Sequence, residues 1–472
     1  MAEKTKAELL KEKLFYDRKN MLEKKQNPDI AEYNRYAEAY KDFLNKAKTE
    51  REAVAYAVEY AEKNGFVPFT YGAKYKAGDK IYFNNRDKSI YLAVIGKESL
   101  EKGMSIAAAH VDSPRIDLKQ CPLYEDGNMA YFKTHYYGGI KKYQWTTVPL
   151  SLHGVVCLKN GEKRTLSIGE KEDDPVFCIT DLLPHLGADQ MAKPMSKAIT
   201  GENLNILIGS TPFEGEDCKD AIKLNVLSIL NEQYGIDEED FLSAELCLVP
   251  SEKARDLGFD RSMICAYGHE DRVCAYPILT AAVEASKTAP RLTHVTILAD
   301  KEEIGSEGTT GMKTKAFDDM LTELCTGTGA NPHVAFANSK CLSADVNSCF
   351  DPTFAEVYEA KNSAFINCGV CLTKFTGARG KSSTNDASAE YVAEVRRIFD
   401  DAGVIWQTGE LGKVDIGGGG TIAYICAKYG MNVIDCGIPV LSMHAPWEVI
   451  SKVDLWEEYK CYCAFLKGAR EF

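Results

Sequence analysis

Two adjacent glutamates, Glu302 and Glu303, follow an apolar, β-branched run at residues 295–298 that is typical of a buried strand. Open α/β sheets place their ligand sites just past the carboxyl ends of strands. Because neighbouring side chains diverge in a turning segment, one carboxylate can bind a metal ion while the other stays free as a general base. An acidic pair is more often solvated loop charge, so this interpretation requires further ligands elsewhere in the chain.

A second short apolar run, residues 106–109, ends in His110, and Asp112 and a chain-breaking Pro114 follow it. Side chains two residues apart on an extended backbone point to the same side. Asp112 can therefore accept the second imidazole N–H and fix the tautomer of a metal-bound His110. A lone histidine at a strand end is more often simply hydrogen-bonded, but the same arrangement recurs.

Three further candidates adjoin expected regular elements. Asp271 stands near the start of a helix expected to reach residue 285, Asp345 follows a short apolar run, and His444 lies close to Pro446. Each has an ordinary explanation when taken alone. Asp271 in particular suits the first turn of a helix, where an acid stabilises the helix dipole.

The candidate ligands together are two imidazoles and three carboxylates: His110, Asp271, Glu303, Asp345 and His444. This set suits two divalent ions with one bridging carboxylate, and N and O donors without thiolate favour Zn²⁺, Co²⁺ or Mn²⁺. Two ions about 3.5–4 Å apart can hold a hydroxide between them and stabilise the oxyanion formed when it attacks a carbonyl. Glu302 is then expected to take the proton from the water and pass it to the leaving amine.

Composition excludes several classes of function. The 472 residues carry a net charge of −13, which works against nucleic acid or an anionic membrane as a partner. No apolar run reaches the roughly 18 residues needed to span a bilayer. Sixteen scattered cysteines, with no signal peptide after the first residues, predict free thiols and a cytoplasmic protein.

The order of expected elements predicts one α/β sheet that is interrupted by an insert. Residues 3–63 have apolar positions at helical spacing, which predicts amphipathic helices packed on a domain. Short β-like runs separated by turn signals, among them Gly138-Gly139, follow from residue 118 to about 250. Helices and strands then alternate to the end of the chain. We therefore expect a catalytic domain in two parts, residues 1–117 and 251–472, around a β-rich domain at residues 118–250.

These motifs resemble those of the aspartyl aminopeptidase family of dinuclear zinc exopeptidases. The resemblance rests on the order and spacing of His-Val-Asp-Ser-Pro (110–114), Glu-Asp-Arg (270–272), Asp-Lys-Glu-Glu-Ile-Gly-Ser (300–306), Ser-Ala-Asp-Val-Asn (343–347) and Ser-Met-His (442–444). It implies a zinc-exopeptidase-like mixed sheet flanked by helices, with an inserted dimerisation domain, and assembly of a homo-oligomer that is a hollow dodecamer.

The resemblance also implies a role for each site residue. His110 and His444 would be terminal ligands, Asp271 the bridge, Glu303 and Asp345 the remaining ligands, Glu302 the base and Asp112 the support of His110. A histidine of the insert would enter a neighbouring subunit's active site, and His185 is the position that matches it.

The expected activity is that of a metalloaminopeptidase acting on short peptides. Eukaryotic members carry a Trp-x-Asp-Arg-Asp-Leu-like run where this chain has Trp-Thr-Thr-Val-Pro-Leu at 145–150, so a preference for acidic N-terminal residues does not follow. Two alternatives remain open. One is a dinuclear amidohydrolase or deacylase acting on a blocked or non-peptide substrate, and the other is a non-catalytic assembly or peptide-binding protein.

Overall fold

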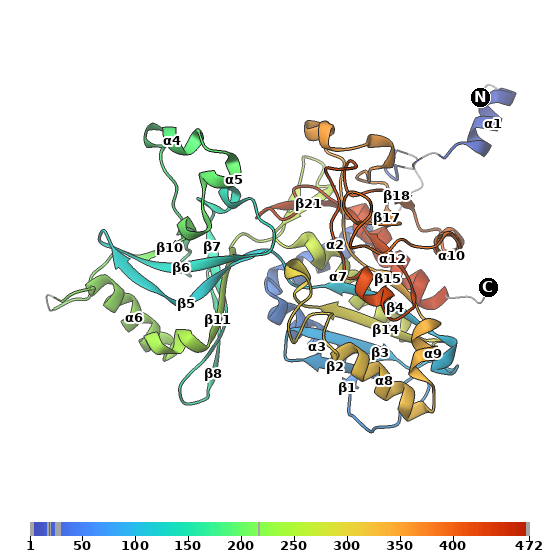
Figure 1. Ribbon diagram of the computed structural model, residues 1–472, viewed down its shortest axis with the longest axis horizontal. Coiled ribbons are helices and arrows are strands. Elements are labelled where there is room, and N and C mark those ends of the chain that lie inside the picture. The colour runs from blue at the N-terminus through green and yellow to red at the C-terminus, as the bar shows by residue number, and fades with distance from the viewer. Residues whose placement is uncertain (1–3, 17, 19, 24–29, 216–217, 469–472) are drawn as a thin grey trace.

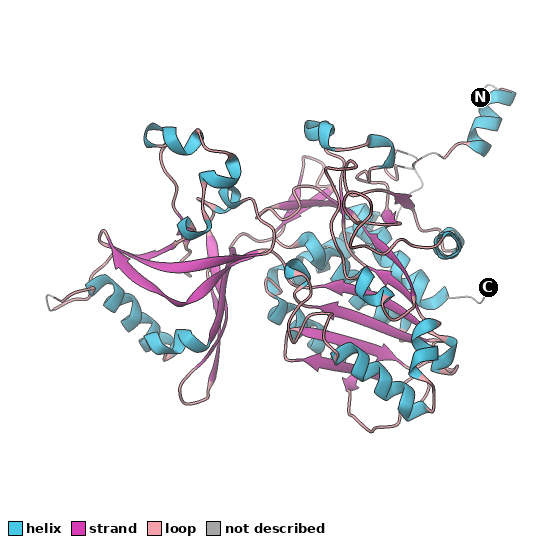
Figure 2. Cartoon of the chain, viewed as in Figure 1, coloured by secondary structure: helices cyan, strands magenta, loops and turns pink. Residues whose placement is uncertain are grey.

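The molecule consists of two lobes, each built on its own sheet (Figure 1). The structure is a computed structural model that describes residues 4–16, 18, 20–23, 30–215 and 218–468. Helices lie on both faces of the larger sheet, while the smaller lobe is mostly strand (Figure 2). The mixed α/β fold class predicted from the sequence is confirmed.

The larger sheet has nine strands of mixed direction. Its centre is a run of four parallel strands, β14, β4, β15 and β19. In the parallel trio of β14, β4 and β15, Ala299 lies opposite His110 and Ser343 opposite Ala108. Because both faces of the sheet are covered, β14 and β4 are buried at every residue instead of alternating between buried and exposed. The strands in spatial order are β1 (Val67–Pro68), β2 (Lys80–Asn85), β3 (Ser89–Val94), β14 (Thr293–Ala299), β4 (Met104–His110), β15 (Lys340–Ser343), β19 (Asn432–Gly437), β17 (Val370–Thr373) and β18 (Trp406–Thr408).

Helices bury their apolar faces on the two sides of this sheet and form two cores. One core contains side chains of α2 (Ile30–Lys46), α3 (Glu50–Lys63), α7 (His269–Ala285), α10 (Ala389–Asp401) and α12 (Lys452–Gly468). The other contains side chains of α8 (Ala316–Thr328), α9 (Pro332–Ala337) and α11 (Ala423–Ala427). Among the described residues, no helix combines the length and the apolar character that crossing a bilayer requires. All sixteen cysteines are free, as predicted.

The N-terminal helices differ in how they pack. Helix α3 starts with a capping box: the side chain of Thr49 accepts the backbone N–H of Glu52, and the side chain of Glu52 accepts the backbone N–H of Thr49. Helix α1 (Lys6–Leu14) also starts with a capping box, but unlike α3 it buries no residue and projects from the body of the molecule (Figure 1). The expectation that the N-terminal helices pack on a domain is therefore met by α2 and α3 and not by α1, whose leucines contact no core.

The smaller sheet has seven strands, all between Arg115 and Pro250. Helix α6 (Ala221–Tyr234) packs against it, and an arm that contains the 3-10 helix η3 (Pro184–Leu186), α4 (Ala188–Met191) and α5 (Met195–Ala198) projects from this lobe (Figure 1). The strands in spatial order are β8 (Lys163–Ile168), β7 (Leu150–Cys157), β11 (Ala244–Pro250), β5 (Arg115–Asp126), β6 (Met129–Tyr137), β10 (Ile206–Gly209) and β9 (Cys178–Ile179).

The remaining short strands form two small groups. They form one sheet of β12 (Arg255–Leu257), β13 (Met263–Ala266) and β21 (Glu448–Ser451), and one pair of β16 (Asn347–Ser348) and β20 (Pro439–Val440).

Candidate metal centre

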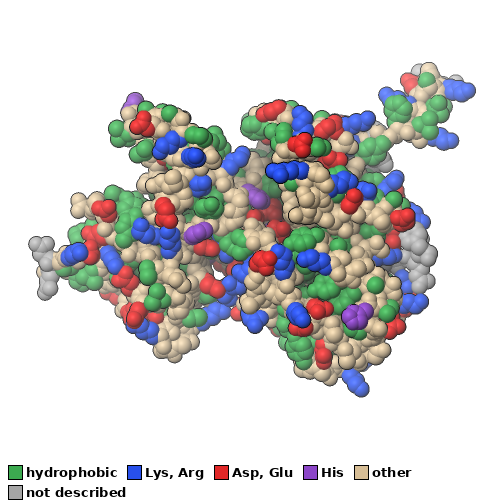
Figure 3. All heavy atoms as spheres, viewed as in Figure 1, with side chains coloured by type: hydrophobic (Ala, Val, Ile, Leu, Met, Phe, Trp, Pro, Cys, Tyr) green, Lys and Arg blue, Asp and Glu red, His purple; other side chains and the backbone are tan. Residues whose placement is uncertain are grey.

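The carboxyl ends of the parallel trio bring three predicted site segments together. His110 is the last residue of β4, and the 3-10 helix η6 (Glu302–Ile304) follows β14. Asp345 lies two residues beyond the end of β15. Parallel neighbours end at one edge of a sheet, so residues far apart in the sequence become neighbours there. Acidic and histidine side chains lie in the hollow between the two lobes (Figure 3).

Two sets of three ligand atoms meet at this edge. One set is His110, Glu270 and Asp345, and the other is Glu270, Glu303 and His444; the atoms of each set lie within 4.8 Å of one another. Glu270 belongs to both sets. Its Oε1 is 2.8 Å from Nε2 of His110, and its Oε2 is 3.6 Å from Nε2 of His444. Each oxygen of one carboxylate thus faces a different set, which is the arrangement of a bridge between two ions.

Asp271, the bridge implied by the sequence, lies in neither set. The backbone of Glu270 and Asp271 is not yet helical, so the two side chains diverge at the front of α7. The longer Glu270 reaches the ligand atoms, whereas Oδ2 of Asp271 accepts the backbone N–H of His110 at 3.2 Å. The geometry therefore favours Glu270 over Asp271 as the carboxylate that could bridge two ions.

Both histidines present Nε2 to the carboxylates. A carbonyl oxygen can only accept, so Nδ1 of His110 donates to the carbonyl of Asp112 at 3.0 Å, and Nδ1 of His444 donates to the carbonyl of Gly139 at 2.8 Å. These bonds fix the neutral tautomer whose free Nε2 can bind a metal ion.

Asp112 holds the segment that carries the two glutamates. Its Oδ1 accepts the backbone N–H of Glu302 at 3.1 Å, and its Oδ2 accepts that of Glu303 at 3.2 Å. Its Oδ1 is also 3.2 Å from Nδ1 of His110. Asp112 therefore lies against Nδ1 of His110 with both its carbonyl and its carboxylate, and its carboxylate also holds η6.

Glu448 is a site residue that sequence reasoning missed. Its Oε2 accepts the backbone N–H of Glu270 at 3.0 Å, and its Oε1 accepts that of His444 at 2.7 Å. It is only 1% exposed, so this one carboxylate ties together two segments that carry ligands. The available signal was an acid directly before the apolar pair Val449-Ile450 of β21, because a buried charge requires partners.

The electrostatics of the centre favour a cation. Burial raises the pKa of Glu302 to about 7 and raises the pKa of Glu303 and Asp345 well above the usual range. For His110, burial opposes protonation, but the carboxylates of Glu270 and Asp112 outweigh it and raise its pKa. Among the described residues, Oε2 of Glu270 and Oε1 of Glu303 are buried without a hydrogen-bond partner. Crowded carboxylates and orphaned oxygens fit divalent ions with N and O ligands.

His185 is not brought to this site within one chain. It lies in η3, exposed, on the projecting arm of the smaller lobe.

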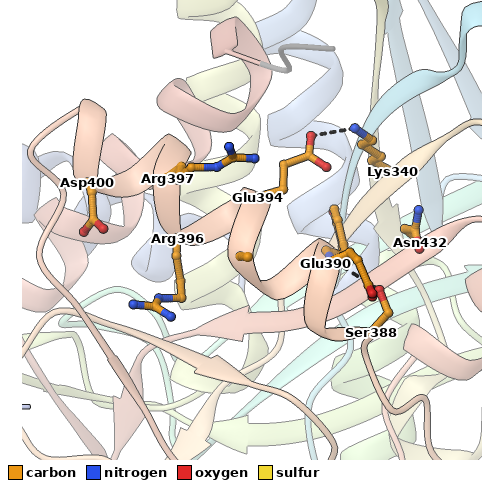
Figure 4. Close-up of a pocket in the computed structure, with 10 residues that line it drawn as sticks. Lys340, Ser388, Glu390, Glu394, Arg396, Arg397, Asp400 and Asn432 are labelled. Atoms are coloured by element: carbon orange, nitrogen blue, oxygen red, sulfur yellow. Dashed lines mark hydrogen bonds and ion pairs between the residues drawn. The ribbon is translucent and has the colours of Figure 1, made fainter. Parts of the chain in front are cut away.

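A cavity of about 760 Å³ lies at the opposite edge of the large sheet. Lys340 and Asn432, the first residues of β15 and β19, line it together with α10, and Lys340 forms an ion pair with Glu394 (Figure 4). Its mixed acids and bases indicate no single ligand chemistry, and it is separate from the metal centre.

Comparison with known proteins identifies relatives along almost the whole chain. A family model described as aminopeptidase I zinc metalloprotease (M18) matches residues 43–466. A probable M18 family aminopeptidase 1 of Clostridium acetobutylicum is 49% identical over 463 residues, which are 96% of this chain and 99% of the relative. The crystal structure of an M18 family aminopeptidase from Thermotoga maritima has a TM-score of 0.91 at 43% identity and covers 96% of this chain and 100% of that one.

A more distant likeness shows the fold alone. The structure of the S. cerevisiae mApe1 dodecamer has a TM-score of 0.76 at 22% identity and covers 93% of this chain and 97% of that one.

Proposed function

Because the chain belongs to the M18 family of zinc aminopeptidases, we propose that it removes the N-terminal residue of short peptides at a pair of divalent metal ions. His110 and Asp345 would hold one ion, Glu303 and His444 the other, and Glu270 would bridge them. The observation that carries this proposal is the presence of Glu270 in both ligand sets, one oxygen toward each histidine.

The side chains of the centre have different roles in this reaction. Zinc ions, when bound, supply Lewis acidity to the attacking water and to the peptide carbonyl. Glu302 lies outside both ligand sets, its carboxylate 4.0 Å from Nε2 of His110. It is positioned to take a proton from the water and to deliver it to the leaving amine. Asp112 holds the backbone of Glu302 and Glu303 in place by accepting both of their N–H groups.

The test is a panel of aminoacyl amides and dipeptides with free or acetylated N-termini and Asp, Glu, Leu or Lys in first position. We expect metal-stripped protein to be inactive and Zn²⁺, Co²⁺ or Mn²⁺ to restore cleavage of the free substrates. The acetylated substrates are expected to resist, because an aminopeptidase requires the free α-amine. Cleavage of only the acetylated set would instead establish a deacylase, and no cleavage with metals bound would favour a non-catalytic protein.

Assembly is proposed on the same basis. One structural relative is a dodecamer, and the arm that carries His185 exposes Leu182, Leu183, Leu186, Met191 and Met195. We assign residues 118–250 as the dimerisation domain of a homo-oligomer, a dodecamer by relationship. The sixteen free cysteines support a cytoplasmic location.

Replacement of His185 by Ala tests whether subunits share sites. If His185 enters a neighbouring centre, we expect turnover to fall roughly 10-fold to 100-fold, as for loss of a supporting residue at a metal site, while zinc content and assembled mass stay unchanged. His333→Ala changes another exposed histidine, in α9, and is expected to have no effect. Full activity of His185→Ala would exclude the residue from the site.

A further inference from the structure

Three consecutive residues of the smaller lobe, Tyr137, Gly138 and Gly139, reach the metal centre of the larger lobe. They form the turn at the end of β6, which we call the Tyr137 turn. We infer that the Tyr137 turn is a positioning element that holds the ligands Glu303 and His444 in place. The inserted lobe would then complete one of the two metal positions as well as serve assembly. This inference rests on the proposed pair of metal ions.

The first contact is made by the phenol of Tyr137. Its hydroxyl donates to Oδ2 of Asp112 at 2.7 Å, the oxygen that also accepts the backbone N–H of Glu303. The ring is itself fixed, because the guanidinium of Arg115 lies 4.0 Å from its centre and Arg115 is held by Glu50 at 3.0 Å. A buried carboxylate that loses one donor becomes less well satisfied and shifts. The phenol therefore acts on Glu303 through Asp112.

The second contact requires a glycine. Gly138 has a φ of +76°, and a Cβ at this position would lie 3.0 Å from Oε2 of Glu303. That oxygen is the far end of a flexible side chain, so the fold can accommodate an added methyl group by displacing the carboxylate. Displacement would take Glu303 away from the position that faces His444.

The third contact sets the tautomer of His444. The carbonyl of Gly139 accepts its Nδ1–H at 2.8 Å. The side chain of His444 is 34% exposed, whereas that of His110 is fully buried, so His444 has less packing to hold it. Asp345 has no such contact with the turn among the described residues. The phenol of Tyr137 bonds to Oδ2 of Asp112, the oxygen that holds Glu303, whereas His110 lies beside Oδ1. The dependence on the inserted lobe therefore falls chiefly on the Glu303 and His444 position.

The experiment compares Gly138→Ala with Gly161→Ala in the full-length protein. Gly161 has a φ of +86° with nothing within 4 Å, so it reproduces the backbone strain without the contact. Zinc per chain is measured after dialysis, and zinc affinity by titration of stripped protein. We expect Gly138→Ala to retain about one zinc and Gly161→Ala about two, with unfolding temperatures lowered alike. Two zinc ions of unchanged affinity in Gly138→Ala would overturn the inference.

A second pair of variants guards against misfolding of Gly138→Ala. Tyr137→Phe removes only the hydroxyl and is expected to weaken zinc at one position by about 10-fold, as loss of a ligand's supporting partner does. Tyr136→Phe is the control, because Tyr136 is 38% exposed and its side chain points to the opposite face of β6. Equal affinity of Tyr137→Phe and the wild type would overturn the role of the turn. Wild-type protein that binds no zinc pair would instead overturn the proposed function, and this inference with it.

Discussion

Glu302→Gln is expected to retain both metal ions and to lose about 10²-fold to 10⁴-fold in kcat, the range attributed to a positioned general base. The glutamine amide keeps the size of the side chain but cannot take a proton. Glu302 belongs to neither ligand set, and its side chain is 17% exposed compared with 4% for Glu303. It is therefore the more accessible of the two to water and substrate.

Glu303→Gln is the matched comparison, because the two residues are adjacent on η6 and both backbone N–H groups are held by Asp112. Zinc per chain and kcat are measured for both variants. The division of labour requires that Glu303→Gln lose metal and that Glu302→Gln keep it. Loss of zinc from Glu302→Gln would make Glu302 a ligand and contradict its assignment as the base.

Much of this centre could be predicted from the sequence, because an apolar run followed by polar residues marks the end of a buried strand. His110, Glu303 and Asp345 each follow an apolar run, and the rule that parallel strands end at one edge predicts that they meet. The structure brings these three together with His444. The same logic predicted the large mixed sheet, since helices and apolar strands alternate on both sides of a β-rich segment.

What could not be anticipated depends on contacts between distant segments. The choice between Glu270 and Asp271 depends on the direction of two neighbouring side chains before the first helical turn, which spacing does not determine. Glu448 reaches the site because β21 pairs with β13, placing it opposite Ala266 beside the start of α7. Gly138-Gly139 reads as a turn signal, and only the packing of one lobe on the other reveals its contacts with Glu303 and His444.

Glu270→Gln is expected to lose both metal ions, because the carboxylate of Glu270 belongs to both ligand sets. The glutamine offers one oxygen and one NH₂ group, so at least one position would face a donor instead of a ligand. We expect zinc affinity to fall by about 100-fold or more, beyond the effect of losing a supporting partner, and hydrolysis to fall with it. Zinc titration of stripped protein and zinc per chain after dialysis measure the effect.

Asp271→Asn decides between the two candidates for the bridge. The asparagine oxygen can still accept the backbone N–H of His110, the contact that Oδ2 of Asp271 makes. Because Asp271 lies in neither ligand set, this variant is expected to keep about two zinc ions and most of its activity. If Asp271→Asn lost both ions while Glu270→Gln kept them, the bridge would be Asp271, as the sequence implied, and the shared position of Glu270 would have another purpose. The neighbouring carboxylates of Glu270 and Asp271 are thus distinguished by their contacts: Glu270 faces the ligand atoms of both sets, and Asp271 accepts a backbone N–H.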